Sequence, residues 1–114
     1  MLLAATPSFA ARVTLSEDWR ANCWRSYPKS VGVPHAEWRG DQFLVDVMVN
    51  WTSASGKIDA RAVTAKLEGD AIRLCYRWAV RPHAEVGALA PVRLVFTVSD
   101  LPRRAYTVSV TENC

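Results

Sequence analysis

Two histidines, each followed two residues later by a glutamate, have the side chains best suited to metal chemistry in this chain. The tetrapeptide Pro-His-Ala-Glu occurs at Pro34–Glu37 and again at Pro82–Glu85. Imidazole and carboxylate groups bind zinc or copper, so a metal site would form if both loops met at one end of the fold. Its ligands would be His35, Glu37, His83 and Glu85. The alternative interpretation is two exposed turns that begin at proline, because the spacing is not a recognised ligand pattern.

A second group of candidates is cationic. Arg73 and Arg77 share the outward parity of one predicted strand, and Lys66 and Arg93 have outward parity on others. Such a stripe suits an acidic protein or an anionic glycan, while the alternative is an ordinary solvated face relieved by nearby acids such as Asp46. The formal net charge is only +3 and no nucleic-acid-binding motif occurs, so we expect no nucleic-acid partner.

Aromatic residues supply the third group. The chain has 5 tryptophans, and three of them, Trp19, Trp24 and Trp38, lie in an irregular segment with an arginine directly after each. Exposed aromatic rings beside arginine suit sugar stacking or a protein interface, whereas rings packed over the end of the fold would explain the same residues. The residues predicted to bind a partner are Trp24, Trp38, Arg39, Arg73 and Arg77.

Catalytic motifs are absent from the sequence. It contains no Gly-x-Ser-x-Gly elbow, no phosphate-binding glycine loop and no His-Glu-x-x-His pair. We therefore expect no catalytic activity. An enzyme that uses a cysteine nucleophile with His35 or His83 is the third hypothesis, because such partners meet only in the fold.

Alternating apolar residues predict the elements that would position these groups. Alternation with β-branched residues is typical of half-buried strands. It extends over 43–51, 58–67, 71–80, 92–99 and 105–114, and a further strand is expected near 12–15. Six or seven strands at this spacing predict an all-β fold, an antiparallel β-sandwich or small barrel. An acidic first turn at Ser16–Asp18 predicts one short helix that continues to Trp24.

The clearest local prediction is a tight hairpin at Gly69-Asp70, because a Gly-Asp pair separates two alternating runs. A two-residue loop also makes the register agree with the apolar pattern. The expected cross-strand pairs are Leu67 with Ile72, Ala65 with Leu74, Val63 with Tyr76, and Lys66 with Arg73.

The segment Leu101-Pro102-Arg103-Arg104-Ala105-Tyr106-Thr107-Val108-Ser109-Val110 resembles the tyrosine corner of fibronectin type III and immunoglobulin-like domains. In those domains the tyrosine hydroxyl bonds back to the backbone a few residues upstream. The resemblance implies a sandwich, and a binding or structural role more readily than catalysis. In this chain the tyrosine strand is the last one, whereas the fibronectin pattern has another after it.

Three cysteines, Cys23, Cys75 and Cys114, permit one disulfide and one free thiol. Cys114 shares the parity of the inward residues of the last predicted strand, and Cys75 shares the outward parity of Arg73 and Arg77. We therefore expect the bridge Cys23–Cys114. An oxidising compartment would make such a bridge stable.

The N-terminus indicates where the protein acts. Residues 1–11 are small and apolar and end in Ser-Phe-Ala-Ala, which resembles the cleavage end of a secretory signal peptide. The alternatives are an N-terminal strand or a disordered apolar tail. Residues 12–114 are expected to form a single domain, and no apolar stretch is long enough to span a membrane. The predicted function is a periplasmic or secreted β-sandwich that binds a protein or glycan partner. The runner-up is a periplasmic metal-binding protein.

Overall fold

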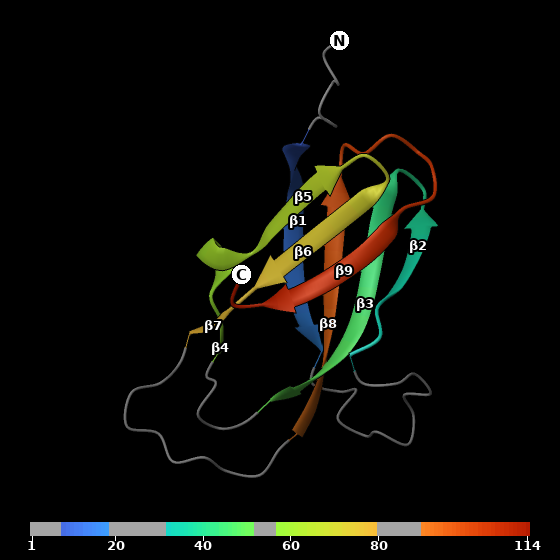
Figure 1. The fold of residues 1–114 in the computed structure, drawn as a ribbon. Coiled ribbons are helices and arrows are strands. Elements are labelled where there is room, and N and C mark those ends of the chain that lie inside the picture. Colours follow the sequence, from blue (N-terminus) through green and yellow to red (C-terminus); the bar gives the residue numbers. More distant parts are fainter. Residues whose placement is uncertain (1–7, 19–31, 52–56, 80–89) are drawn as a thin grey trace.

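A computed structural model describes residues 8–18, 32–51, 57–79 and 90–114 (Figure 1). This part of the chain is almost entirely strand, as predicted, with one 3-10 turn at Ala60–Ala62. The strands are β1 (Ser8–Asp18), β2 (His35–Arg39), β3 (Gln42–Trp51), β4 (Lys57–Ile58), β5 (Thr64–Glu68), β6 (Ala71–Tyr76), β7 (Trp78–Ala79), β8 (Ala90–Ser99) and β9 (Thr107–Glu112). None of these residues belongs to a helix long and apolar enough to cross a membrane.

Seven strands form one curled sheet in the order β2-β3-β8-β1-β5-β6-β9, and β4 pairs with β7 in a separate two-stranded sheet. Figure 1 shows β5, β6 and β9 crossing in front of the other strands of the large sheet. We call these three strands the front layer, and β2, β3, β8 and residues 12–18 of β1 the rear layer. All pairings in the large sheet are antiparallel except β6 with β9, which is parallel. The predicted all-β, sandwich-like fold is therefore confirmed, and the sheet is mixed because its last strand pairs parallel where antiparallel pairing was expected.

Strand β1 joins the two layers. Its first four residues pair with β5, from Ser8 opposite Glu68 to Ala11 opposite Ala65. Its remaining residues, 12–18, pair with β8. Residues 8–11 thus lie in a paired strand, one of the alternatives that the sequence left open for the N-terminus. The expectation of a helix is wrong at residues 16–18, which continue that strand because long-range pairing with β8 outweighs the local capping signal. Residues 19–24, where the rest of that helix was expected, lie outside the described residues.

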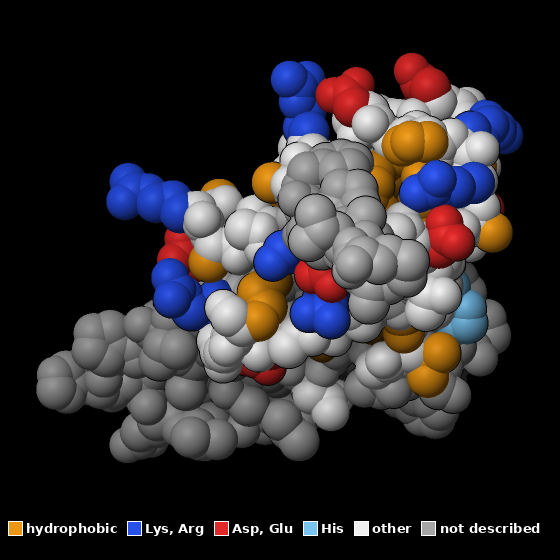
Figure 2. Space-filling model, turned by 45° about the horizontal axis from the view of Figure 1, so that its top comes forward, with side chains coloured by type: hydrophobic (Ala, Val, Ile, Leu, Met, Phe, Trp, Pro, Cys, Tyr) orange, Lys and Arg blue, Asp and Glu red, His pale blue; other side chains and the backbone are white. Residues whose placement is uncertain are grey.

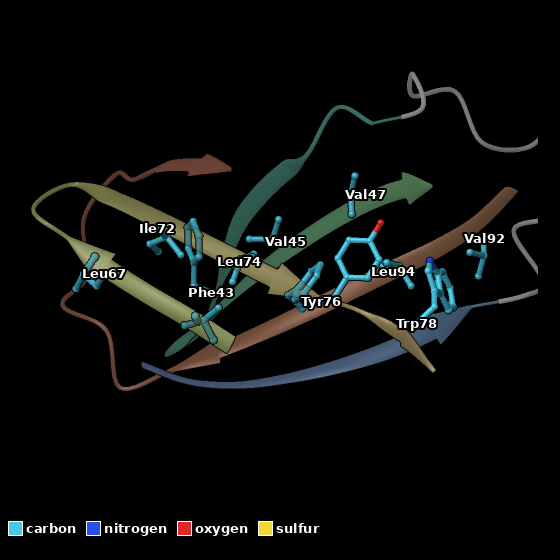
Figure 3. Close-up of a cluster of buried hydrophobic side chains, with 13 residues drawn as sticks. Phe43, Val45, Val47, Leu67, Ile72, Leu74, Tyr76, Trp78, Val92 and Leu94 are labelled. Atoms are coloured by element: carbon cyan, nitrogen blue, oxygen red, sulfur yellow. The ribbon is translucent and has the colours of Figure 1, made fainter. Parts of the chain in front are cut away.

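The core lies between the layers and is built from the inward residues of the alternating strands (Figure 3). Its buried members are Phe43, Val45, Val47, Ala65, Leu67, Ile72, Leu74, Tyr76, Trp78, Val92, Leu94, Phe96 and Val98. Tyr76 contacts Trp78 and Phe96 edge-on, at centroid distances of 6.0 and 6.3 Å. Burial, with the Glu112 carboxylate adding to it, raises the pKa of Tyr76 to about 12. The phenol is therefore neutral at physiological pH.

The predicted hairpin is confirmed. Leu67 lies opposite Ile72 and Ala65 opposite Leu74, as the apolar pattern requires. Gly69 adopts a φ of 58°, in the left-handed region where a side chain would add strain, which explains the glycine at the turn. The flanking runs are each interrupted, however. The run 58–67 divides into β4, the 3-10 turn and β5, and the run 71–80 divides into β6 and β7.

The disulfide joins Cys75 to Cys114, whose Cα atoms lie 6.0 Å apart, so the expected bridge Cys23–Cys114 is wrong. The prediction assumed that side chains alternate between the two faces as far as Cys114. Asn113, with a φ of 59°, ends this alternation. Cys114 thus leaves the inward face and reaches Cys75, which lies opposite Thr111 on the adjacent strand. Cys23 lies outside the described residues.

Candidate functional site

The outward side of the front layer carries three exposed cations, Lys66, Arg73 and Arg77, which we call the cationic face. Lys66 on β5 lies directly opposite Arg73 on β6, as predicted. Their side chains are 59%, 66% and 57% exposed, for Lys66, Arg73 and Arg77 respectively. Arg77 follows β6 on the same parity as Arg73, so the two arginines extend the face along the strand.

Hydroxyl groups border the cationic face on the side of β9. Parallel pairing places Ala71 opposite Thr107, Arg73 opposite Ser109 and Cys75 opposite Thr111. The three β9 residues Thr107, Ser109 and Thr111 are exposed. They provide hydrogen-bond donors and acceptors one strand away from the guanidinium of Arg73.

Acidic side chains accompany the cations but are less exposed. Glu68 is 31% exposed and lies 3.8 Å from Lys66 and 3.7 Å from Arg73. Asp59 is 27% exposed, and Arg77 donates to it at 3.0 Å. This hydrogen bond is the main reason that the pKa of Asp59 is lowered, so Asp59 remains ionised. A ligand approaching from solvent therefore meets the cations before it meets the carboxylates.

Trp38, predicted to bind a partner, is half-buried and serves as a packing residue at one end of the sheet. Its Nε1 donates to the carbonyl oxygen of Arg104 at 2.8 Å, and its ring lies 5.2 Å from that of Phe43. The guanidinium of Arg103 stacks 5.4 Å from the centre of its ring. Arg39, next to Trp38, is exposed and pairs with Glu37 at 2.8 Å. Trp24 lies outside the described residues.

His35 and Glu37 line a shallow hollow of about 220 Å³ on the outward side of the rear layer, together with Asp46 and Arg93. The Nε2 atom of His35 is buried there and has no hydrogen-bond partner among the described residues. Within those residues no group of three or more potential ligands is close enough to hold a metal ion. His83 and Glu85 lie outside the described residues, so the zinc or copper site stays a prediction.

One ionic cluster could not be predicted from the sequence. Arg93 on β8 lies 2.6 Å from Asp46 on β3 and 3.6 Å from Asp18 on β1. Asp46 is only 9% exposed, so this arrangement neutralises a nearly buried carboxylate. Parity had placed Asp46 and Arg93 on outward faces, but only the strand order β3-β8-β1 shows that they meet.

The structure thus places the predicted site residues at several separate positions on the sheet. Arg73 and Arg77 lie on the front layer, Trp38 and Arg39 at the turn between β2 and β3, and His35 at the opposite end of β2. Comparison with known proteins found no matching family model, no matching curated protein and no matching solved structure.

Proposed function

We propose that this chain is an exported binding module, without catalysis of its own, that receives an acidic protein segment or anionic glycan on the cationic face. The observation that carries the proposal is the difference in exposure on that face. Lys66, Arg73 and Arg77 stand out into solvent while the acids beside them are less than one-third exposed.

The chemistry of the face suits carboxylate or sulfate groups. Arginine presents a planar fork of donors that matches such anions, and the adjacent hydroxyls of β9 add neutral donors. Each exposed ion pair contributes at most about 1 kcal/mol, so useful affinity requires several contacts along an extended partner. Binding of this kind weakens as salt rises.

Export is supported by two features. Structural disulfides persist mainly in oxidising compartments, and the described residues contain the Cys75–Cys114 bond. The small apolar residues at the N-terminus resemble the end of a secretory signal. Both fit a periplasmic or secreted protein.

Calorimetry tests the proposed function. It would measure the binding of heparin and of a poly-glutamate peptide at two salt concentrations. The informative variant is Arg73→Gln. Its matched control is Arg12→Gln, which removes the same charge from an exposed position on the outward side of the rear layer. We expect Arg73→Gln to weaken binding of at least one polyanion about fivefold, which corresponds to roughly 1 kcal/mol, and Arg12→Gln to have no such effect.

Two results would overturn the proposal. One is that wild-type protein binds neither polyanion at low salt. The other is an equal loss in both variants, which would mean that only the overall charge matters.

A further inference from the structure

Strand β9 forms one edge of the large sheet and pairs only with β6 among the described strands. The amide of Thr107 donates to the carbonyl oxygen of Asp70, and that of Asn113 donates to Tyr76. The N–H and C=O of one residue point to the same side of a strand, and the side alternates from residue to residue. The odd-numbered residues therefore bond to β6. The backbone groups of Val108, Val110 and Glu112 point to the free edge.

Among the described residues, this edge has none of the features that usually protect an edge strand. Natural edges are blocked by lysine, proline, a bulge or a covering loop. At the opposite edge, β2 is held near its end by the loop that follows β8, through Trp38 to Arg104 and Arg103 to Gly40. Strand β9 reads Thr-Val-Ser-Val-Thr-Glu and carries a single charge, at its last residue. The Cys75–Cys114 bond ties the chain to β6 just beyond it.

Five of the six residues of this strand form a palindrome. Residues 107–111 read Thr-Val-Ser-Val-Thr, which is symmetric about Ser109. We propose that β9 pairs antiparallel with β9 of a second copy of this chain, with the two-fold axis at Ser109. Val108 then lies opposite Val110 of the second copy, Ser109 opposite Ser109, and Thr107 opposite Thr111.

The hydrogen-bonding parity agrees with this register. The residues that direct backbone groups to the free edge, Val108 and Val110, become the hydrogen-bonded pair, as an antiparallel ladder requires. Ser109, whose own backbone groups point to β6, becomes a non-hydrogen-bonded pair, where side chains are closest. Paired β-branched residues and paired hydroxyls both stabilise neighbouring strands.

Charge complementarity supports the same register. Glu112 of each copy reaches the position opposite Tyr106 of the other copy. The guanidinium of Arg104 stacks 5.2 Å from the centre of the Tyr106 ring and pairs with Asp70 at 3.2 Å, so Glu112 of the other copy would join an existing ion pair at each end of the paired segment. A symmetric pairing centred on Val110 instead would place Val108 opposite Glu112 and lose these matches. The proposed dimer extends the front layer into one continuous sheet across both copies, an isologous two-fold interface.

Sedimentation velocity over a concentration series tests the pairing, using Ser109→Lys and Ser109→Glu. In each variant two like charges face one another at the axis, so each alone should dimerise at least about tenfold more weakly than wild type. An equal mixture of the two brings opposite charges together and should restore the dimer. Thr64→Lys is the matched control, because it adds the same charge at an exposed residue of β5, away from the edge, and should dimerise like wild type.

Val110→Pro provides a second test that does not depend on charge. The amide of Val110 points to the free edge, so proline removes a donor from the interface but none from the β6–β9 ladder. Because Val110 also packs against the core, the variant should melt at a somewhat lower temperature, but the folded protein should be monomeric at every concentration. The inference is overturned if wild type remains monomeric at every concentration, if Ser109→Lys dimerises as well as wild type, or if the mixture of lysine and glutamate variants stays monomeric. None of these readouts involves a polyanion, so they are independent of the proposed function.

Discussion

At the scale of single residues, Tyr106 fixes the loop between β8 and β9. Its hydroxyl donates to the carbonyl oxygen of Pro102 at 2.6 Å. The ring also packs 5.6 Å from that of Phe43. Tyr106→Phe keeps the ring and removes the hydrogen bond, so we expect a loss of about 1 kcal/mol in the free energy of unfolding, measured by urea denaturation. An unchanged free energy would show that the bond exchanges with water at no cost.

Arg93 is the second residue whose contribution to stability can be tested by itself. It neutralises Asp46 and Asp18 across three strands. Without Arg93, the Asp46 carboxylate is left nearly buried with less compensation for its charge. Arg93→Met should therefore lower the free energy of unfolding, measured by urea denaturation, by roughly 3 kcal/mol. Adding Asp46→Asn removes that nearly buried charge and should recover part of the loss. A double variant no more stable than Arg93→Met alone would contradict this account.

At the scale of elements, the last strand depends on its disulfide. The bond between Cys75 and Cys114 closes a segment with a sequence separation of 39. The chain-entropy relation gives about 4 kcal/mol for a loop of that length. Cys114→Ser should therefore lower the free energy of unfolding by up to about 4 kcal/mol, and Cys23→Ser, the matched control, should leave it unchanged. Peptide mapping of the oxidised protein should recover Cys75 joined to Cys114, and a peptide joining Cys23 to Cys114 would refute the pairing.

The strands also show which structural features sequence patterns can predict. The hairpin at Gly69 was predictable, because its turn chemistry and its apolar register are both local. The parallel pairing of β9 with β6 was not, since alternation fixes which face a residue occupies and not which strand lies beside it. Asn113 shows the limit of parity itself. Because Asn113 has a left-handed backbone conformation, Cys114 lies on the outward face and bonds to Cys75 instead of Cys23.

In the candidate sites, too, local features were predictable from the sequence and long-range contacts were not. Parity placed Arg73 and Arg77 outward, and the hairpin register placed Lys66 beside Arg73, so most of the cationic face was predictable. Its acids, Glu68 and Asp59, were not assigned, because Asp59 reaches Arg77 only through the pairing of β4 with β7. The packing of Trp38 depends on a contact with Arg104, 66 residues away in the sequence, that no local pattern encodes.

At the scale of the whole molecule, β1 is the strand that joins the two layers into one hydrogen-bonded sheet in the described part of the chain. Residues 8–11 belong to the front layer by pairing with β5, while residues 12–18 belong to the rear layer by pairing with β8. Ala11 also packs against the core. The order β8-β1-β5 therefore makes the N-terminal strand the connection between the cationic face and the rest of the sheet.

Two N-terminal truncations test this connection. Removing residues 1–7 leaves every described pair of β1 intact and should change the free energy of unfolding little. Removing residues 1–11 deletes the four pairs with β5, which hold about four ladder hydrogen bonds, so at about 1 kcal/mol for each bond the free energy of unfolding should fall by roughly 4 kcal/mol. Because β5 then becomes an edge, the amides of β5 and β6 should also exchange hydrogen faster, while those of β3 and β8 stay protected. Equal stability of the two truncations would show that the layers hold together by side-chain packing alone.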